Sequence, residues 1–265
     1  MKKLEKSILF EPWNMGDAVM ALAIALQDPT RLSLACNSKW HELLRCAAHG
    51  MDMPKFLSVD LGYISRNKDG YLKFGDLPKM YDNTTVLSIR GDVRDYYAAK
   101  KMFPNSQIRA NGWLSFLAKR STLIDFPFAR GWVPVRNRYR AWALMANIKW
   151  ADVERFYQQK GPLTTPRSVV IHVGAQWRSR QYPHVAELVE NLKKTSNVQI
   201  VAGPGNLLPD GIRDSDVSRL VNHDLVNVLQ SSSYVITNDS GPMHLAALLR
   251  CRTLVVTRQA AIQEW

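Results

Sequence analysis

The segment whose residues are best suited to chemistry runs from Val235 to Ala247 and reads V-I-T-N-D-S-G-P-M-H-L-A-A. Its pattern predicts an apolar strand that ends at Thr237, a tight polar turn, and a helix with Pro242 near its first position. The start of such a helix presents backbone N–H groups without helical partners and the positive end of the helix dipole. Both features favour an anion, so the segment predicts a phosphate site.

Four residues of this segment are candidates for binding. Gly241 permits close approach of a phosphate, and the hydroxyl of Ser240 can add a hydrogen bond. Because a carboxylate does not bind phosphate, we expect Asp239 to bind a hydroxyl, as on a sugar. His244 lies one helical turn further on, on the face toward the turn. Each residue also fits a structural role, with Asp239 or Ser240 as a helix cap and His244 packed against the sheet.

The elements that must position this segment alternate along the chain. In the second half we expect strands at 168–173, 198–202, 234–237 and 253–257, and helices at 183–194, 224–230 and 242–249. In the first half we expect strands at 7–10, 31–35 and 85–89, a helix at 17–27, one or two helices within 138–159, and irregular structure at 60–84. Strands separated by helices imply an α/β fold with parallel sheets, in which ligands bind at the carboxyl ends of the strands.

The best linker candidate is the segment 161–166, which has two prolines and a glycine in six residues. Such a segment interrupts any helix. We therefore expect two domains, one over residues 1–160 and one over residues 161–265, that face each other across a cleft.

The composition is that of a soluble globular protein, with 46% hydrophobic and 22% charged residues in a chain of 265. No segment approaches the roughly 20 consecutive apolar residues of a membrane helix, so we expect a cytoplasmic protein. The three cysteines, Cys36, Cys46 and Cys251, form no C-x-x-C pair. Their number and spacing argue against both a disulfide framework and a zinc site.

The positive charge is concentrated in one part of the chain. The formal net charge is +12, and residues 90–149 hold twelve basic and three acidic residues, a net charge of +9. Such a field favours an acidic partner: nucleic acid, an anionic membrane surface or a phosphorylated acceptor. A solvated basic face without a dedicated ligand is the alternative.

Three segments together resemble glycosyltransferase family 9, which includes the ADP-heptose:lipopolysaccharide heptosyltransferases. The run N-D-S-G-P-M-H-L-A-A at 238–247 resembles the signature of that family. The segment 14–19 is similar to the family's N-terminal Gly-Asp turn, and the segment 172–183 resembles the loop that opens its second domain. The three occur in the expected order and extend the resemblance from about residue 7 to residue 257.

The resemblance implies a GT-B fold, which consists of two Rossmann-like domains with parallel sheets facing a cleft. It implies an inverting transfer without metal or cofactor, from a nucleotide-diphosphate-sugar bound mainly by the second domain. The expected sugar is a heptose or a similar sugar, with ADP-heptose as the first donor to consider. The expected acceptor is an acidic lipid or glycan of the lipopolysaccharide type, met at the inner face of the membrane. A non-catalytic relative that binds a nucleotide-sugar is the alternative.

The resemblance also assigns roles to residues. Asp17 matches the general base that takes the proton from the acceptor hydroxyl, although its place in the sequence also suits a helix N-cap. The turn before it, Asn14, Met15 and Gly16, belongs to the acceptor side. Arg180 falls where the family has a lysine on the donor phosphates, with Arg178 as a second choice. The donor-binding residues are then Gly174, Ala175, Gln176, Arg178, Arg180, Gly203, Asp239, Ser240, Gly241 and His244.

The sequence departs from the family in several places. The family often has an acid for the ribose hydroxyls where this chain has the segment 203–206, and the next acid is Asp210, so the nucleotide stays open. The chain ends at Trp265, soon after the strand expected at 253–257, so we expect a shortened second domain. The D-x-D sequence at 214–216 resembles the metal motif of GT-A enzymes. It lies in a polar stretch, however, and is better interpreted as a loop or a helix start.

Nucleic-acid binding is a further class to consider. It is suggested by the charge and by Trp132, Tyr139 and Trp142 among arginines. An apolar helix explains these aromatic residues equally well, and the sequence has no nucleic-acid-binding motif. A nicotinamide-dependent dehydrogenase is disfavoured, because no G-x-G-x-x-G follows a strand.

Overall fold

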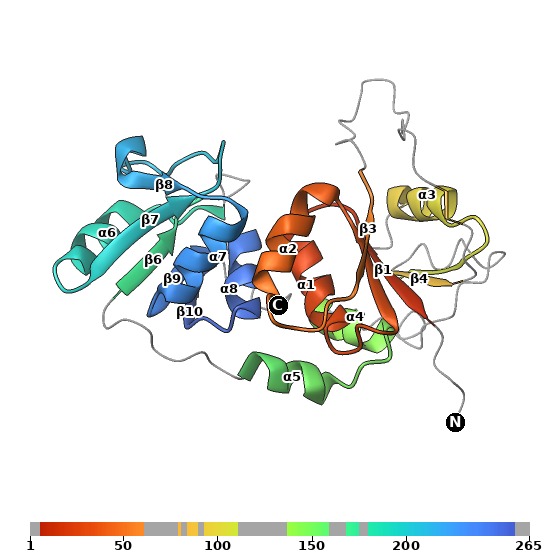
Figure 1. Ribbon diagram of the computed structural model, residues 1–265. Coiled ribbons are helices and arrows are strands. Elements are labelled where there is room, and N and C mark those ends of the chain that lie inside the picture. The colour runs from red at the N-terminus through yellow and green to blue at the C-terminus, as the bar shows by residue number, and fades with distance from the viewer. Residues whose placement is uncertain are drawn as a thin grey trace, which may run out of the picture. The chain divides into compact units, whose positions relative to one another are not determined.

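The computed structural model describes residues 6–60, 79–80, 84–89, 93–110, 137–158, 168–174 and 180–257. These residues form two five-stranded sheets, with strand orders β3-β2-β1-β4-β5 and β10-β9-β6-β7-β8. Every pair of neighbouring strands is parallel. The first sheet comes from the red-to-yellow half of the chain and the second from the green-to-blue half (Figure 1). The expected α/β fold with parallel sheets is confirmed.

The two sheets belong to two compact units, and the division between them falls at residues 153 and 154, with residues 42–50 grouped with the second unit. The domain boundary expected after residue 160 and the linker expected at 161–166 lie outside the described residues. The boundary therefore stays a prediction.

The first sheet consists of β1 (Ser7–Glu11), β2 (Leu32–Cys36), β3 (Lys55–Ser58), β4 (Thr85–Ser88) and β5 (Gln107–Ala110). The helices of this half of the chain are α1 (Met15–Ala25), α2 (His41–Ala47), α3 (Val93–Met102), α4 (Arg138–Met145) and α5 (Trp150–Gln158), with a 3-10 turn at Ser38–Trp40. The sequence did not predict β3, β5, α2 or α3. Most of the segment 60–84 lies outside the described residues.

The core of the first unit explains why β1 and α1 form where they do. All five residues of β1 are buried, as is usual for a central parallel strand. Every residue of α1 after Met15 is buried as well, so this helix is enclosed on all sides. The fully buried Trp142 belongs to α4, which packs against α1. Asn147, with φ of 53°, separates α4 from α5, because asparagine tolerates the left-handed conformation that ends a helix.

The second sheet consists of β6 (Ser168–His172), β7 (Asn197–Ala202), β8 (Val217–Arg219), β9 (Tyr234–Asn238) and β10 (Thr253–Val256). Its helices are α6 (Val185–Lys193), α7 (Asn222–Ser231) and α8 (Gly241–Leu248), with a 3-10 turn at Asp214–Asp216. Apart from β8, the strands and the three α-helices match the expected ranges within two residues at each end.

The register of the second sheet brings the carboxyl ends of four strands to one edge. His172 pairs with Val201 and with Thr237, so β6, β7 and β9 end side by side. Ala202 at the end of β7 pairs with Arg219 at the end of β8. The segments that follow these strands, including the turn before α8, therefore leave the sheet at the same edge, where ligands of parallel sheets bind.

No helix in the described ranges combines the length and the apolar character needed to cross a membrane.

Candidate functional site

The turn between β9 and α8 has the geometry of an anion site. Ser240 precedes the helix with an extended backbone, at φ of −156° and ψ of 173°, and its side chain makes no capping hydrogen bond. The hydroxyl instead donates to the carbonyl oxygen of Asn238 at 3.2 Å. Gly241 and Pro242 form the first two positions of α8. Ser240 thus provides no side-chain cap for this helix, so a ligand can occupy the place that a capping oxygen takes elsewhere.

Asp239 presents a buried carboxylate at the same turn. Its residue is 8% exposed, and its Oδ1 has no hydrogen-bond partner within the described part of the chain. A buried carboxylate oxygen without a donor is costly, because it has lost water and gained nothing in return. A hydroxyl-bearing ligand would supply the missing donor. Asp239 does not cap the helix, since the N-cap position belongs to Ser240.

Asn238 holds the ends of three segments together, and the sequence did not single it out. Its Oδ1 accepts from the backbone N–H of Tyr182 at 3.0 Å, and its Nδ2 donates to the carbonyl oxygen of Val173 at 3.2 Å. The residue is 4% exposed. The end of β9 is thereby joined to the segment after β6 and to the segment before α6. An asparagine directly after an apolar strand was the only signal in the sequence.

Gly174 and Gly203, two of the expected donor-binding residues, are brought together by Asn206. The Oδ1 of Asn206 accepts from the backbone N–H of Gly203 at 2.9 Å. A Cβ built on Gly174 would lie 2.2 Å from the same oxygen, far closer than atoms can approach. Asn206 therefore packs directly over Gly174 and leaves no room there for a side chain. This close packing links the loops after β6 and β7.

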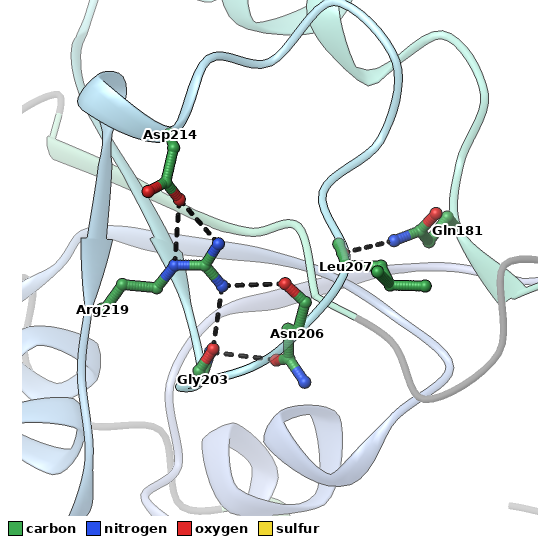
Figure 2. A network of polar contacts seen from close by, with 6 residues as sticks. All are labelled: Gln181, Gly203, Asn206, Leu207, Asp214 and Arg219. Carbon is green, nitrogen blue, oxygen red and sulfur yellow. Dashed lines mark hydrogen bonds and ion pairs between the residues drawn. The ribbon is translucent and has the colours of Figure 1, made fainter.

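Arg180 lies in the segment between β6 and α6. Its side chain is exposed and makes no ion pair with another described residue, which leaves it available to an anion. The next residue, Gln181, donates from Nε2 to the carbonyl oxygen of Leu207 at 2.7 Å (Figure 2). The expected residues Ala175, Gln176 and Arg178 lie outside the described residues.

Two histidines are buried at this end of the second unit. His244 in α8 is 3% exposed, so its ring is enclosed by protein. His172 at the end of β6 is 4% exposed, and burial lowers the pKa of its imidazole to about 4. The His172 ring is therefore neutral near pH 7.

Asp17 lies in the first unit, in the first turn of α1. The helix begins at Met15 after Asn14, so the N-cap alternative for Asp17 is wrong: it is the third helical residue. Asp17 is 6% exposed, and its Oδ1 lies 2.7 Å from Nη1 of Arg138. Asn14 is exposed, Met15 is half-buried and Gly16 is buried.

Arg138, the partner of Asp17, is the first residue of α4 and was not among the expected site residues. The Oδ1 of Asn137 accepts from the backbone N–H of Arg140 at 3.0 Å and so caps this helix. The cap fixes the start of α4, and with it the position from which Arg138 reaches Asp17. The charge-assisted hydrogen bond from Nη1 of Arg138 to Oδ1 of Asp17 restricts the orientation of that carboxylate.

Trp13 lies next to the Asn14–Gly16 turn and is also fixed. Its indole Nε1 donates to the carboxylate of Asp95, which is 1% exposed. The indole of Trp40 donates to the backbone carbonyl oxygen of Trp13 at 3.3 Å. These contacts, which the sequence did not predict, stabilise the segment between β1 and α1.

The D-x-D sequence at 214–216 forms a 3-10 turn before β8, which confirms its interpretation as a helix start. Asp216 pairs with Arg213 at 3.0 Å, and Asp214 pairs with Arg219 at 2.7 Å. The acids thus contact arginines. Among the described residues no group of three or more His, Cys, Asp or Glu side chains is arranged to hold a metal ion.

Neither a protein-family model nor a curated protein sequence matches the chain. Several solved structures match its fold. The Escherichia coli heptosyltransferase WaaC with ADP is 14% identical, with a TM-score of 0.57 over 94% of this chain and 86% of that one. A family 9 glycosyltransferase from Veillonella parvula is 12% identical, with a TM-score of 0.58 over 97% and 87%. The E. coli ADP-heptose lipopolysaccharide heptosyltransferase II is 14% identical, with a TM-score of 0.54 over 94% and 84%. The chain therefore has the GT-B fold of the family 9 heptosyltransferases, as its sequence motifs predict.

Proposed function

We propose that the chain is a glycosyltransferase that uses a nucleotide-diphosphate-sugar as its donor. The observation that carries the proposal is the turn at 239–241: a helix start that Ser240 does not cap with its side chain lies beside the buried carboxylate of Asp239, one of whose oxygens has no donor among the described residues. A helix start favours phosphate and a carboxylate favours a hydroxyl, so together they suit a ligand with both groups. A nucleotide-sugar is such a ligand.

Several neighbouring features support a diphosphate at this turn. Arg180 carries an exposed positive charge in the segment after β6. Asn238 ties that segment to the end of β9, which keeps it at the same edge of the sheet. In the solved structures of similar fold, WaaC is described with ADP and with ADP-2-deoxy-2-fluoro heptose. We therefore take ADP-heptose as the first donor to test.

The proposed transfer inverts the anomeric carbon and uses no metal. Asp17 takes the proton from the acceptor hydroxyl while the oxygen attacks the anomeric carbon from the face opposite the diphosphate. The bond from the anomeric carbon to the phosphate oxygen breaks, and its electron pair leaves on the diphosphate. The start of α8 and Arg180 stabilise the charge that develops there. The proposed acceptor is an acidic lipid or glycan of the lipopolysaccharide type.

A non-catalytic nucleotide-sugar-binding protein is the second candidate. The observation in its favour is the ion pair between Asp17 and Arg138, with Oδ1 and Nη1 2.7 Å apart. A carboxylate held by a guanidinium must still reach the acceptor hydroxyl in order to act as a base. The two candidates share the donor site and differ in whether the first unit performs chemistry.

The test separates donor binding from transfer. Calorimetric titration with ADP, GDP, UDP and ADP-heptose is performed with magnesium and with chelator. Equal binding of one nucleotide under both conditions is expected, and binding that requires magnesium would contradict metal independence. Transfer from ADP-heptose to a deacylated lipopolysaccharide acceptor is then compared between the wild type and Asp17→Asn. Transfer should vanish with nearly unchanged donor affinity, because a base acts only in the transition state. Near-normal turnover in Asp17→Asn would refute the general-base role.

A further inference from the structure

Arg219, the last residue of β8, is the centre of a polar network at the carboxyl edge of the second sheet (Figure 2). Its Nε and Nη2 donate to Oδ1 of Asp214 at 3.2 and 2.7 Å. Its Nη1 donates to the carbonyl oxygens of Gly203 and Asn206 at 3.0 and 2.9 Å. All three guanidinium nitrogens and four of the five N–H donors thus bind the protein itself, which leaves this arginine little capacity to bind phosphate.

The two carbonyl groups belong to one tight turn. Asn206 donates from its backbone N–H to the carbonyl oxygen of Gly203 at 3.2 Å, which closes the turn. Pro204 occupies the second position and Gly205, with φ of 71°, the third, which are the residues that a type II turn prefers. The side chain of Asn206 binds back to the N–H of Gly203. Arg219 therefore bridges the first and the last residue of a turn that Gly203 and Asn206 already close with two hydrogen bonds of their own.

The turn lies where a ligand at the start of α8 would extend. It follows β7, whose last residue pairs with Arg219, and its Asn206 packs over Gly174 after β6. The strand order places β6 between β9 and β7. Neighbouring strands are about 4.8 Å apart, so the ends of β9 and β7 are separated by about 10 Å. A nucleoside attached to a diphosphate at the start of α8 reaches that far.

We propose that Arg219 is a positioning residue: together with Asp214 it holds the Gly203–Asn206 turn in the shape that receives the nucleoside part of the donor. The inference rests on the function proposed above and extends it to recognition of the nucleoside. Arg219 acts through the turn and makes no contact with the ligand. Asp214 orients the guanidinium, because both of its contacts come from the fork of one arginine.

The effect expected from losing Arg219 follows from the composition of the turn. A turn with two glycines samples other backbone conformations once the two charge-assisted hydrogen bonds at its ends are removed. A ligand must then order the turn as it binds, and its apparent affinity falls by the fraction of time for which the turn has the right shape. The proposed phosphate site at the start of α8 lies elsewhere on the carboxyl edge of the sheet and does not depend on the conformation of the Gly203–Asn206 turn.

The experiment compares Arg219→Met with Arg213→Met. Arg213 lies in the same segment, but its 80% exposed side chain pairs with Asp216 and forms no hydrogen bond with the Gly203–Asn206 turn. Wild type and variants are titrated with ADP, GDP, UDP and inorganic pyrophosphate. For the nucleotide that binds, Arg219→Met should weaken affinity about tenfold, or roughly 1.4 kcal/mol. The affinity of Arg219→Met for pyrophosphate should change less than about twofold. The control Arg213→Met should bind both the nucleotide and pyrophosphate as the wild type does. The nucleotide affinity of Arg219→Lys should lie between those of the wild type and Arg219→Met, because an ammonium keeps the charge but lacks the guanidinium fork.

Unchanged nucleotide affinity in Arg219→Met overturns the proposal, and so does an equal loss of pyrophosphate affinity, which would indicate damage to the whole site. Hydrogen exchange of the ligand-free protein tests, without any nucleotide, whether Arg219 holds the Gly203–Asn206 turn in place. The backbone amides of Gly203 and Asn206 should exchange faster in Arg219→Met and at the wild-type rate in Arg213→Met. Equal protection in both variants overturns the role of Arg219. Failure of the wild type to bind any nucleotide instead refutes the proposed function, together with the nucleoside role that rests on it.

Discussion

The ion pair between Asp17 and Arg138 should contribute measurably to the stability of the first unit. The two side chains are 7% and 34% exposed, so the carboxylate is buried while water still reaches the guanidinium. Removing one partner of a fully buried pair costs about 3–5 kcal/mol, whereas an exposed pair contributes about 0.2–1 kcal/mol. Since only one member is buried, we expect Arg138→Met to lower the free energy of unfolding by about 2 kcal/mol.

A double-mutant cycle isolates the pair from the other contacts of the two residues. Asp17→Asn should cost about 1 kcal/mol, because the arginine left behind is partly solvated. The double variant should cost less than the sum of the single ones, with a coupling energy of about 1–2 kcal/mol. Arg140→Met is the matched control, since Arg140 lies on the same helix and its guanidinium stacks on Trp150 instead, 5.0 Å from the ring centre.

Urea unfolding followed by tryptophan fluorescence is a suitable assay, because six of the eight tryptophans precede residue 154 and the signal reports mainly on the first half of the chain. The transition midpoints at unchanged slope give the free-energy differences. A coupling energy below about 0.5 kcal/mol would refute the reasoning, because it would mean that the 2.7 Å contact persists without contributing to stability. It would also remove the argument that Arg138 orients Asp17.

Three further predictions concern the second unit. Gly174→Ala should destabilise it by about 1–3 kcal/mol in thermal unfolding, because the new Cβ overlaps Oδ1 of Asn206, and adding Asn206→Ala should recover part of that loss. Burial lowers the pKa of His172 to about 4, so the unfolded chain binds the extra proton below about pH 6.5. The free energy of unfolding should therefore fall by up to roughly 3 kcal/mol between pH 6.5 and pH 4, and urea titrations at several pH values should show a smaller fall in His172→Gln. Ser240→Ala and Arg180→Ala should each weaken calorimetric binding of the nucleoside diphosphate, and unchanged affinity in both would remove the proposed phosphate site.

The sequence predicted the strands of the second sheet best where they are continuously apolar. β6 and β9 are buried over four of their five residues, and such runs stand out in any window. β3 and β8 were missed because each is an edge strand that is only partly buried. α3 was missed for a related reason, since its tyrosines, lysines and arginine give little apolar periodicity over ten residues. A continuous apolar run is thus what made a strand visible, and β10 was predicted from such a run although it is an edge strand without a fully buried residue.

The candidate site was predicted in its backbone and missed in its side-chain partners. The start of α8, with Asp239 and Ser240 before it, follows from local pattern, because a strand, a turn and a helix are neighbours in sequence. The contact of Asn238 with Tyr182 joins residues 56 positions apart, and that of Arg138 with Asp17 joins residues 121 positions apart. No local pattern encodes such pairs. They depend on the register of the sheet and on how α4 packs against α1.

Two ion pairs change how the charge of the chain should be interpreted. Counting basic residues treats every arginine as available to an anionic ligand, yet Arg138 and Arg219 bind Asp17 and Asp214 at 2.7 Å each. Recruiting either one for a phosphate would require breaking an ion pair and, for Arg219, two bonds to backbone carbonyl oxygens as well. Arg180 is exposed and forms no ion pair with another described residue. A diphosphate at the start of α8 can therefore bind Arg180 at the cost of ordering one side chain. The position of Arg180, and not the total charge of the chain, is thus decisive for binding.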